Sequence, residues 1–102
     1  MIDHLTTKEA LVLELLAGAE RFGLELVDRS GGGLRRGTVY VTLQRMEEKD
    51  LVSSRPEAAA RPGDRPGGLP RRLYRATALG ERLLALHRGF RDAVLAAQRG
   101  RP

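Results

Sequence analysis

Residues 36–49 constrain the fold most, because they combine a helical hydrophobic pattern with a clear stop. At about 100° per residue, Val39, Leu43 and Met46 fall on one face of a helix. A short apolar strand is predicted directly after it, over residues 51–55. The face opposite the apolar stripe, with Tyr40 at its border, carries Thr38, Val41, Gln44, Arg45, Glu48 and Lys49. We therefore expect this helix to bury one stripe in a core and to present the other face to solvent.

Two further helices are predicted before this segment. The run Thr6-Thr7-Lys8-Glu9 has the pattern of a capping box, and apolar residues then recur at helical spacing until Gly18 closes the helix. A second helix is predicted to begin near residues 20–22. It must end at the glycines 31–33, because consecutive glycines lose too much backbone entropy to stay helical.

Two strands and a last helix are predicted after it. Segment 56–70 is rich in Pro and Gly, which favour turns, so it separates strand 51–55 from strand 71–76 in an antiparallel hairpin. In the second strand, alternation puts Leu73 on one side and Arg72 and Tyr74 on the other. Thr77 can cap a final helix over residues 78–99.

The final helix carries more apolar surface than a small domain can cover. Its apolar residues step by four and three positions, which is typical of a coiled-coil seam, and Leu84 and Leu95 widen the stripe. The helix either packs back on its own domain or pairs with a second copy, and the second alternative fits the seam better. The predicted dimer interface consists of Leu79, Leu83, Leu86, Phe90, Ala93, Val94 and Ala97.

This order of elements predicts a mainly α (α+β) fold. It is that of a winged helix-turn-helix with a two-stranded β wing in residues 1–77, followed by a C-terminal dimerisation helix in residues 78–102. With 102 residues the chain is expected to form one compact unit.

Composition narrows the class of protein. The chain has no cysteine, which excludes disulfides and thiolate metal sites and fits a cytoplasmic protein. No apolar run approaches the ~18 residues that span a membrane, and the first residues lack the layout of a signal peptide. No membrane association is expected.

The positive charge is concentrated in the second half of the chain. The net charge is +5, with 7 basic and 9 acidic side chains in residues 1–50 but 11 basic and 4 acidic ones in residues 51–102. Sixteen of the 18 basic residues are Arg, whose planar fork donates two hydrogen bonds to a phosphate at once. This distribution indicates an anionic partner.

The exposed face of helix 36–49 and the basic hairpin together fit double-stranded DNA. An amphipathic helix of this kind fits the major groove, where Arg45 suits a guanine edge and Gln44 an adenine. Arg61 and Arg65, at the tip of the hairpin, are placed to enter a minor groove. Phosphate contacts are predicted for Arg35, Arg36, Arg71 and Arg72, and Lys49 is predicted as a further DNA-binding residue.

Four stretches of the sequence resemble the PadR family of winged-helix transcriptional regulators, in its short form with one C-terminal helix. They are residues 11–16, 22–26, 36–52 and 70–80, of which the Gly-Thr-Val-Tyr step and the following helix are the most specific. The resemblance implies a homodimeric DNA-binding repressor that responds to a small molecule, whose identity the sequence does not give. It also implies that Thr38 and Tyr40 lie near the DNA backbone and that Val41, where the family often has Pro, contacts a thymine methyl.

The sequence departs from the family pattern at three points. Asp50 stands where a Gly is usual, which predicts a different or strained turn, and Phe22 stands where a His is usual. The chain has no Trp, so it cannot sandwich a flat ligand between tryptophans in a dimer pore, as some short members of the family do.

Two other functions remain open: a winged-helix module for protein interaction, and a low-specificity architectural DNA-binding protein. An enzyme is not expected, because His4 and His87 lie in different elements without an acidic or nucleophilic cluster around them. No catalytic residue, metal ligand or cofactor is predicted.

Overall fold

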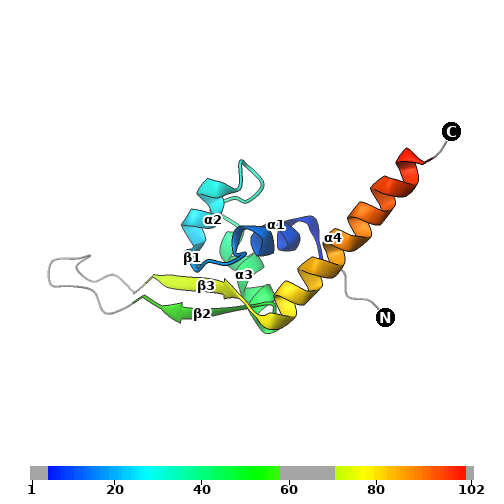
Figure 1. Ribbon diagram of the computed structural model, residues 1–102. Coiled ribbons are helices and arrows are strands. Elements are labelled where there is room, and N and C mark those ends of the chain that lie inside the picture. The colour runs from blue at the N-terminus through cyan, green and yellow to red at the C-terminus, as the bar shows by residue number, and fades with distance from the viewer. Residues whose placement is uncertain (1–4, 58–70, 101–102) are drawn as a thin grey trace, which may run out of the picture.

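The computed structural model describes residues 5–57 and 71–100, so Arg61, Arg65 and His4 lie outside the described residues. Three helices pack against one another, a sheet lies along one side of them, and a long last helix runs out of this body toward the C-terminus (Figure 1). The elements in chain order are α1 (Thr7–Leu15), β1 (Arg21–Phe22), α2 (Gly23–Arg29), α3 (Val39–Glu48), β2 (Val52–Pro56), β3 (Arg72–Ala76) and α4 (Ala78–Arg99). The predicted winged-helix architecture is confirmed.

The sheet has one strand more than the sequence predicted. Its order is β1-β3-β2, and both pairings are antiparallel, with Ser54 opposite Tyr74 and Phe22 opposite Leu73. The hairpin of β2 and β3 was predicted, but β1 was missed. A strand of only two residues gives no alternating pattern, and it exists because it pairs with β3.

Local capping explains where the first and last helices begin. At the start of α1, the Glu9 backbone N–H donates to Thr6 Oγ1 (3.1 Å) and the Thr6 N–H donates to Glu9 Oε1 (2.9 Å), so the predicted capping box is present. At the start of α4, the Gly80 N–H donates to Thr77 Oγ1 (3.0 Å), which confirms Thr77 as the cap.

Two other predicted helix boundaries were wrong by a few residues. Helix α1 ends at Leu15 rather than at Gly18. Helix α2 begins at Gly23, later than predicted, because Arg21 and Phe22 belong to β1. The Glu25 carboxylate accepts a hydrogen bond from the Phe22 N–H (2.9 Å) and so satisfies one free donor at the new start.

Helix α3 is shorter than residues 36–49. It begins at Val39, whose N–H donates to the Arg35 carbonyl (2.9 Å), and Arg36–Thr38 form a turn that includes Gly37, a poor helix former. At its end the Leu51 N–H donates to the Met46 carbonyl (2.8 Å) and the Asp50 N–H to the Glu47 carbonyl (3.0 Å). This is a Schellman motif, and Asp50 occupies its left-handed position with φ 61°.

The core lies between the three short helices and the sheet. Val39, Leu43 and Met46 are each 0% exposed, which confirms the predicted buried stripe of α3. Tyr74 is buried from β3, so its side of the strand is the core side. The remaining buried apolar residues are Leu5, Ala10, Val12, Leu13, Leu16, Leu26, Leu34, Leu51, Val52 and Leu84. In the described part of the chain, no helix is long and apolar enough to cross a membrane.

The first turn of α4 is locked to the end of α3. The Thr77 N–H donates to the Leu51 carbonyl (3.0 Å), and Thr77 Oγ1 donates to the Asp50 carbonyl (2.5 Å). Gly80 lies so close that a Cβ built on it would be 2.1 Å from the Leu51 carbonyl oxygen. Only glycine permits this approach between α4 and the α3–β2 turn.

We expect Gly80→Ala to lower the free energy of unfolding by about 2 kcal/mol, because the new methyl group must push the Leu51 backbone away. Gly89→Ala is the matched control, since a Cβ at Gly89 meets no atom within 4 Å. It should instead stabilise α4 by about 0.5–1 kcal/mol. Urea unfolding of both variants measures the difference, and equal effects would contradict this account of Gly80.

Candidate nucleic-acid interface

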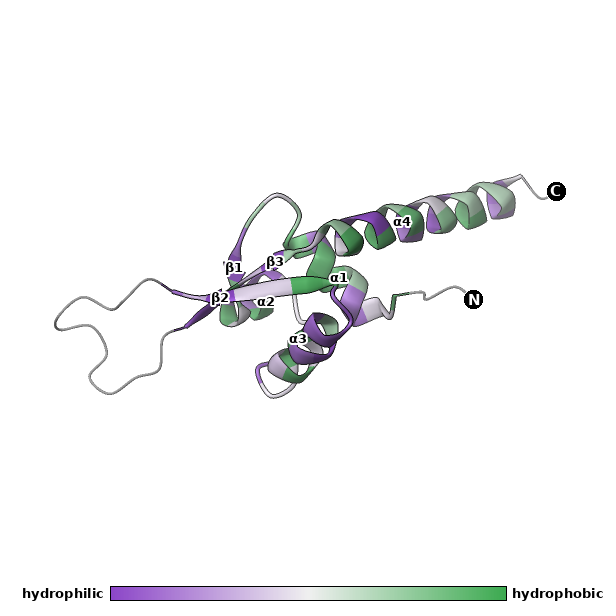
Figure 2. Cartoon of the chain, turned by 90° about the horizontal axis from the view of Figure 1, so that it is seen from below, coloured by the Kyte–Doolittle hydropathy of each residue, from purple (hydrophilic) through white to green (hydrophobic). Residues whose placement is uncertain are grey.

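The face of α3 opposite its buried stripe is exposed, as the sequence predicted. Tyr40 and Val41 are each 49% exposed, although both are large apolar side chains. Figure 2 shows that α3 alternates hydrophilic and hydrophobic positions at the edge of the body. The predicted contact residues Thr38, Gln44, Arg45 and Lys49 are exposed as well.

This face of α3 borders a shallow hollow of about 750 Å³, which the start of α1 closes on the other side. From α3 and its end, the hollow is lined by Thr38, Val41, Thr42, Arg45 and Lys49, and from α1 by Thr6, Thr7, Lys8 and Glu9. Thr7 and Lys8 were not predicted as site residues, because their motif indicates only a helix cap. They line the hollow because α1 contacts α3, and this contact is a feature of tertiary structure.

Three arginines on α3 and in the turn before it have no acidic partner in the described part of the chain. Arg35 and Arg36 lie in the turn before α3, and Arg45 projects from its outer face. All three are exposed, and none takes part in a salt bridge within residues 5–57 and 71–100. Because the positive end of the α3 dipole lies next to Arg35 and Arg36, this corner of the molecule attracts anions.

Other predicted DNA contacts are already engaged within the protein. The Arg71 guanidinium donates to both carboxylate oxygens of Glu57 (3.2 and 3.0 Å) and stacks 4.2 Å from the centre of the Phe22 ring. Arg72 Nε donates to Ser54 Oγ (3.0 Å), which in turn donates to Glu47 (2.7 Å). Arg71 and Arg72 must therefore give up contacts within the protein before they bind DNA, whereas the arginines around α3 have no salt bridge to break in the described part of the chain.

Lys49 is paired with Glu9, whose side chain is buried at the start of α1. Burial by itself would raise the pKa of Glu9, but hydrogen bonds from Lys49 and from the Thr6 backbone outweigh it and hold that pKa below 4.5. The pair links α1 to the end of α3 and so helps to hold the exposed face of α3 in place.

This link predicts a pH-dependent stability. Because the pKa of Glu9 is lower in the folded state, its contribution is complete above the unfolded pKa and is lost as the pH falls through the folded value. We expect Glu9→Gln to lower the free energy of unfolding by about 1 kcal/mol at pH 7, with the difference from wild type shrinking below pH 4.5.

Urea unfolding between pH 3 and 7 measures this difference. Glu48→Gln is the control, since Glu48 is an exposed carboxylate at the end of α3 without a salt bridge among the described residues. It should follow the wild-type pH dependence, and a Glu9→Gln curve parallel to it would show that Lys49 contributes nothing.

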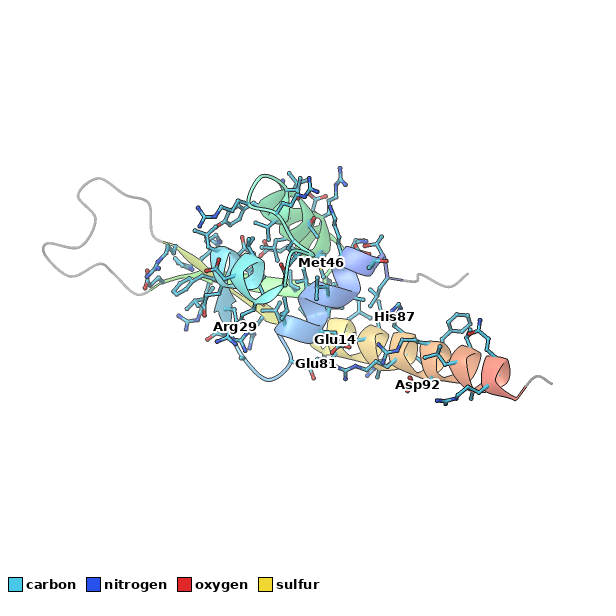
Figure 3. All side chains as sticks on the ribbon, turned by 90° about the horizontal axis from the view of Figure 1, so that it is seen from above. Glu14, Arg29, Met46, Glu81, His87 and Asp92 are labelled. Atoms are coloured by element: carbon cyan, nitrogen blue, oxygen red, sulfur yellow. The ribbon has the colours of Figure 1, made fainter. Side chains whose placement is uncertain are left out.

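The geometry offers a recognition surface and shows no metal centre within residues 5–57 and 71–100. No group of three or more His, Cys, Asp or Glu side chains there is arranged to hold a metal ion. His87 lies partly buried on α4, close to Glu14 (Figure 3).

Fold and surface together define a winged-helix transcriptional regulator. The sequence profile of the transcriptional regulator PadR-like family matches residues 12–86, which is most of the chain. The chain therefore belongs to this family, as the motifs in residues 11–80 indicated. No curated protein matches the sequence.

Solved structures of the same family have the same fold. A PadR family transcription regulator from Clostridium difficile is 25% identical, with a TM-score of 0.68 over 93% of this chain and 100% of that one. A PadR-like regulator from Bacillus cereus is 21% identical, with a TM-score of 0.65 over 92% of each chain. Bacillus subtilis PadR, solved in complex with operator DNA, is 16% identical, with a TM-score of 0.67 over 81% of this chain and 46% of that one.

Proposed function

We propose that this chain is a sequence-specific DNA-binding repressor that reads its operator as a homodimer, with α3 in the major groove. The observation that carries the proposal is the division of α3 into a fully buried stripe and an exposed face beside Arg35, Arg36 and Arg45. The solved complex of Bacillus subtilis PadR with operator DNA supports the same use of this fold.

The residues of α3 divide into base readers and phosphate contacts. Arg45 is placed to donate to a guanine O6 and N7, Gln44 to pair with an adenine edge, and Val41 to contact a thymine methyl. Thr38 and Tyr40 lie at the start of the helix, where they approach the DNA backbone. Arg35 and Arg36 bind phosphates without reading sequence.

Lys8 and the wing add further phosphate contacts in this proposal. Lys8 is exposed on the far side of the hollow from Arg45, so a strand that lies along the hollow meets both side chains. Arg72 reaches the backbone by giving up its bond to the Ser54 hydroxyl. Arg71 and Lys49 contribute less, because each must first leave a carboxylate.

Dimerisation uses the face of α4 that points away from the body. At about 100° per residue, Leu84 and Arg88 lie roughly opposite Leu86 and Phe90. Leu84 is 4% exposed against the body, whereas Leu86 and Phe90 are 66% and 72% exposed. Of the predicted seam, Leu79, Val94, Ala93 and Ala97 are also exposed, and Leu83 is half-buried. The helix thus has one face for its own domain and a separate apolar face for a second copy.

A symmetric dimer of this kind reads a pseudo-palindromic operator with half-sites about one helical turn, or a multiple of it, apart. Regulation by a small molecule would complete the repressor function. With no Trp in the chain, a ligand would have to be held by other side chains than a pair of tryptophans.

Binding-site selection on randomised duplexes tests the proposed reading of DNA. Arg45→Ala should relax the base preference at one position of each half-site. Arg36→Ala should weaken binding to all sequences alike and reduce the slope of log K against log salt by about 2 per dimer. Arg82→Ala, on α4, is the control for loss of one exposed charge. An unchanged motif for Arg45→Ala would refute the register assigned to α3.

The same experiment separates the alternatives. A low-specificity architectural protein binds duplexes but yields no motif, and a protein-interaction module binds no duplex even at low salt.

The dimer is tested by sedimentation velocity. Leu86→Glu places a charge in the middle of the proposed apolar seam and should convert the protein to a monomer at micromolar concentration. Ala85→Glu places the same charge on the neighbouring exposed position outside the seam and should leave a dimer. A wild-type monomer, or identical behaviour of both variants, would rule out this interface.

A further inference from the structure

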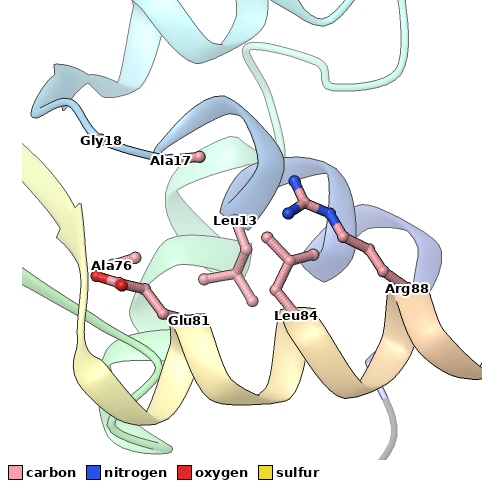
Figure 4. Close-up of a pocket in the computed structure, with 7 residues that line it drawn as sticks. All are labelled: Leu13, Ala17, Gly18, Ala76, Glu81, Leu84 and Arg88. Atoms are coloured by element: carbon pink, nitrogen blue, oxygen red, sulfur yellow. The ribbon is translucent and has the colours of Figure 1, made fainter.

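Few residues of α1 and α4 form the contact between these two helices, which we call the joint, although α4 is a long helix. Leu84 packs against Leu13 of α1, and Arg88 extends from α4 across to α1 one turn later (Figure 4). From Gly89 to Gly100 every residue is exposed. Among the described residues, the last ion pair between α4 and the body is the one made by Arg88.

That contact is a two-point ion pair. Arg88 Nε donates to Glu14 Oε1 (2.7 Å), and Arg88 Nη2 donates to Glu14 Oε2. The guanidinium and the carboxylate are both planar, so two parallel hydrogen bonds fix their relative orientation as well as their distance. The hydrogen bond from Arg88 lowers the pKa of Glu14, so the pair stays ionised at neutral pH.

Packing alone does not fill this joint. A hollow of about 180 Å³ lies between the end of α1 and α4. It is lined by the small residues Ala17, Gly18 and Ala76 and by Leu13, Glu81, Leu84 and Arg88. These small side chains leave α4 room to tilt about its locked first turn at Gly80. If no contact farther along the helix held it, the tilt of α4 would be limited by the packing of Leu84 and its neighbours.

We propose that the Glu14–Arg88 pair sets the angle between α4 and the DNA-reading body, and thereby determines which spacing of half-sites the dimer accepts. This inference rests on the proposed function, since it requires that the outer part of α4 joins two copies and that α3 reads DNA. Glu14 and Arg88 are then positioning residues. They determine specificity although neither touches DNA.

A small change in the angle between α4 and the body produces a large displacement at the far end of the helix. A helix of 22 residues is about 33 Å long, so a tilt of about 10° displaces its far end by roughly 6 Å. One base pair advances the duplex by ~3.4 Å. A change of this size in each protomer moves the two α3 helices by more than one base pair relative to each other, so a loose joint accepts several spacings where a fixed joint accepts one.

An exposed ion pair suits this role, because its loss changes orientation without unfolding the protein. The Glu14 and Arg88 side chains are 37% and 43% exposed, so water solvates both when they separate. The core residues at the joint, Leu13 and Leu84, stay in place in such a variant.

The angle is measured directly with a spin label in the dimer. The chain has no cysteine, so Asp28→Cys on the exposed surface of α2 gives one labelled site per protomer and one distance per dimer. Arg88→Gln in this background should widen the distance distribution by roughly 6 Å, the displacement expected from a tilt of about 10°. An absent dipolar signal for the wild type means a monomer and refutes the proposed dimer, whereas an unchanged width for Arg88→Gln refutes only the present inference.

Operators with half-sites moved apart or together by single base pairs test the functional consequence. We expect wild type to prefer one spacing at least about tenfold, and Arg88→Gln to reduce that preference to about threefold or less while it binds an isolated half-site unchanged. Arg91→Gln is the matched control, because it removes the same charge from α4 but its partner, Asp92, is on α4 itself.

Charge reversal completes the test. The double variant Glu14→Arg with Arg88→Glu keeps the pair and should restore both the narrow distance and the spacing preference. Wild-type spacing preference in Arg88→Gln, or failure of the double variant to recover what each single reversal loses, would overturn the proposal.

Discussion

Burial of one stripe of α3 is the constraint on which the rest of the structure depends. Val39, Leu43 and Met46 have no exposed surface, and together they fix both the position and the rotation of the helix. A helix held by three buried side chains cannot turn about its axis without exposing them to water. The opposite face is thereby presented with a defined register, which is what a surface needs in order to distinguish one sequence of bases from another.

The charged side chains fall into two groups: those paired within the protein and those without an acidic partner in the described part of the chain. Four ion pairs link separate segments of the chain: Glu9 with Lys49, Glu14 with Arg88, Glu20 with Arg55 and Glu57 with Arg71. The arginines around α3 have no such partners in the described part of the chain. The net charge of the chain therefore overstates how many unpaired arginines the described strands offer to DNA. It also understates how strongly the unpaired positive charge is concentrated beside α3.

Helix α4 packs on its own domain and also keeps an apolar face uncovered, so the structure is compatible with both alternatives that the sequence leaves open. The first turns are held by Gly80, Leu84 and Arg88, and the remaining turns project away from the body (Figure 1). In the proposed dimer, a helix that is half docked and half projecting couples the second copy to α3. In that dimer, the few contacts between α1 and α4 therefore affect the relative position of the two α3 helices, although each contact contributes little free energy.

The sequence by itself determined the elements with strong local signals. The capping box at Thr6, the cap at Thr77, the stripe of α3 and the 22-residue span of α4 follow from residue spacing and side-chain chemistry alone. It also marked Asp50 as unusual for its turn, and the left-handed backbone there is the reason. Tertiary structure alone decided β1, the hollow between α1 and α3, and the partner of each charged side chain. These depend on contacts between residues far apart in the chain, such as Lys49 with Glu9 or Arg88 with Glu14, and local periodicity carries no information about them.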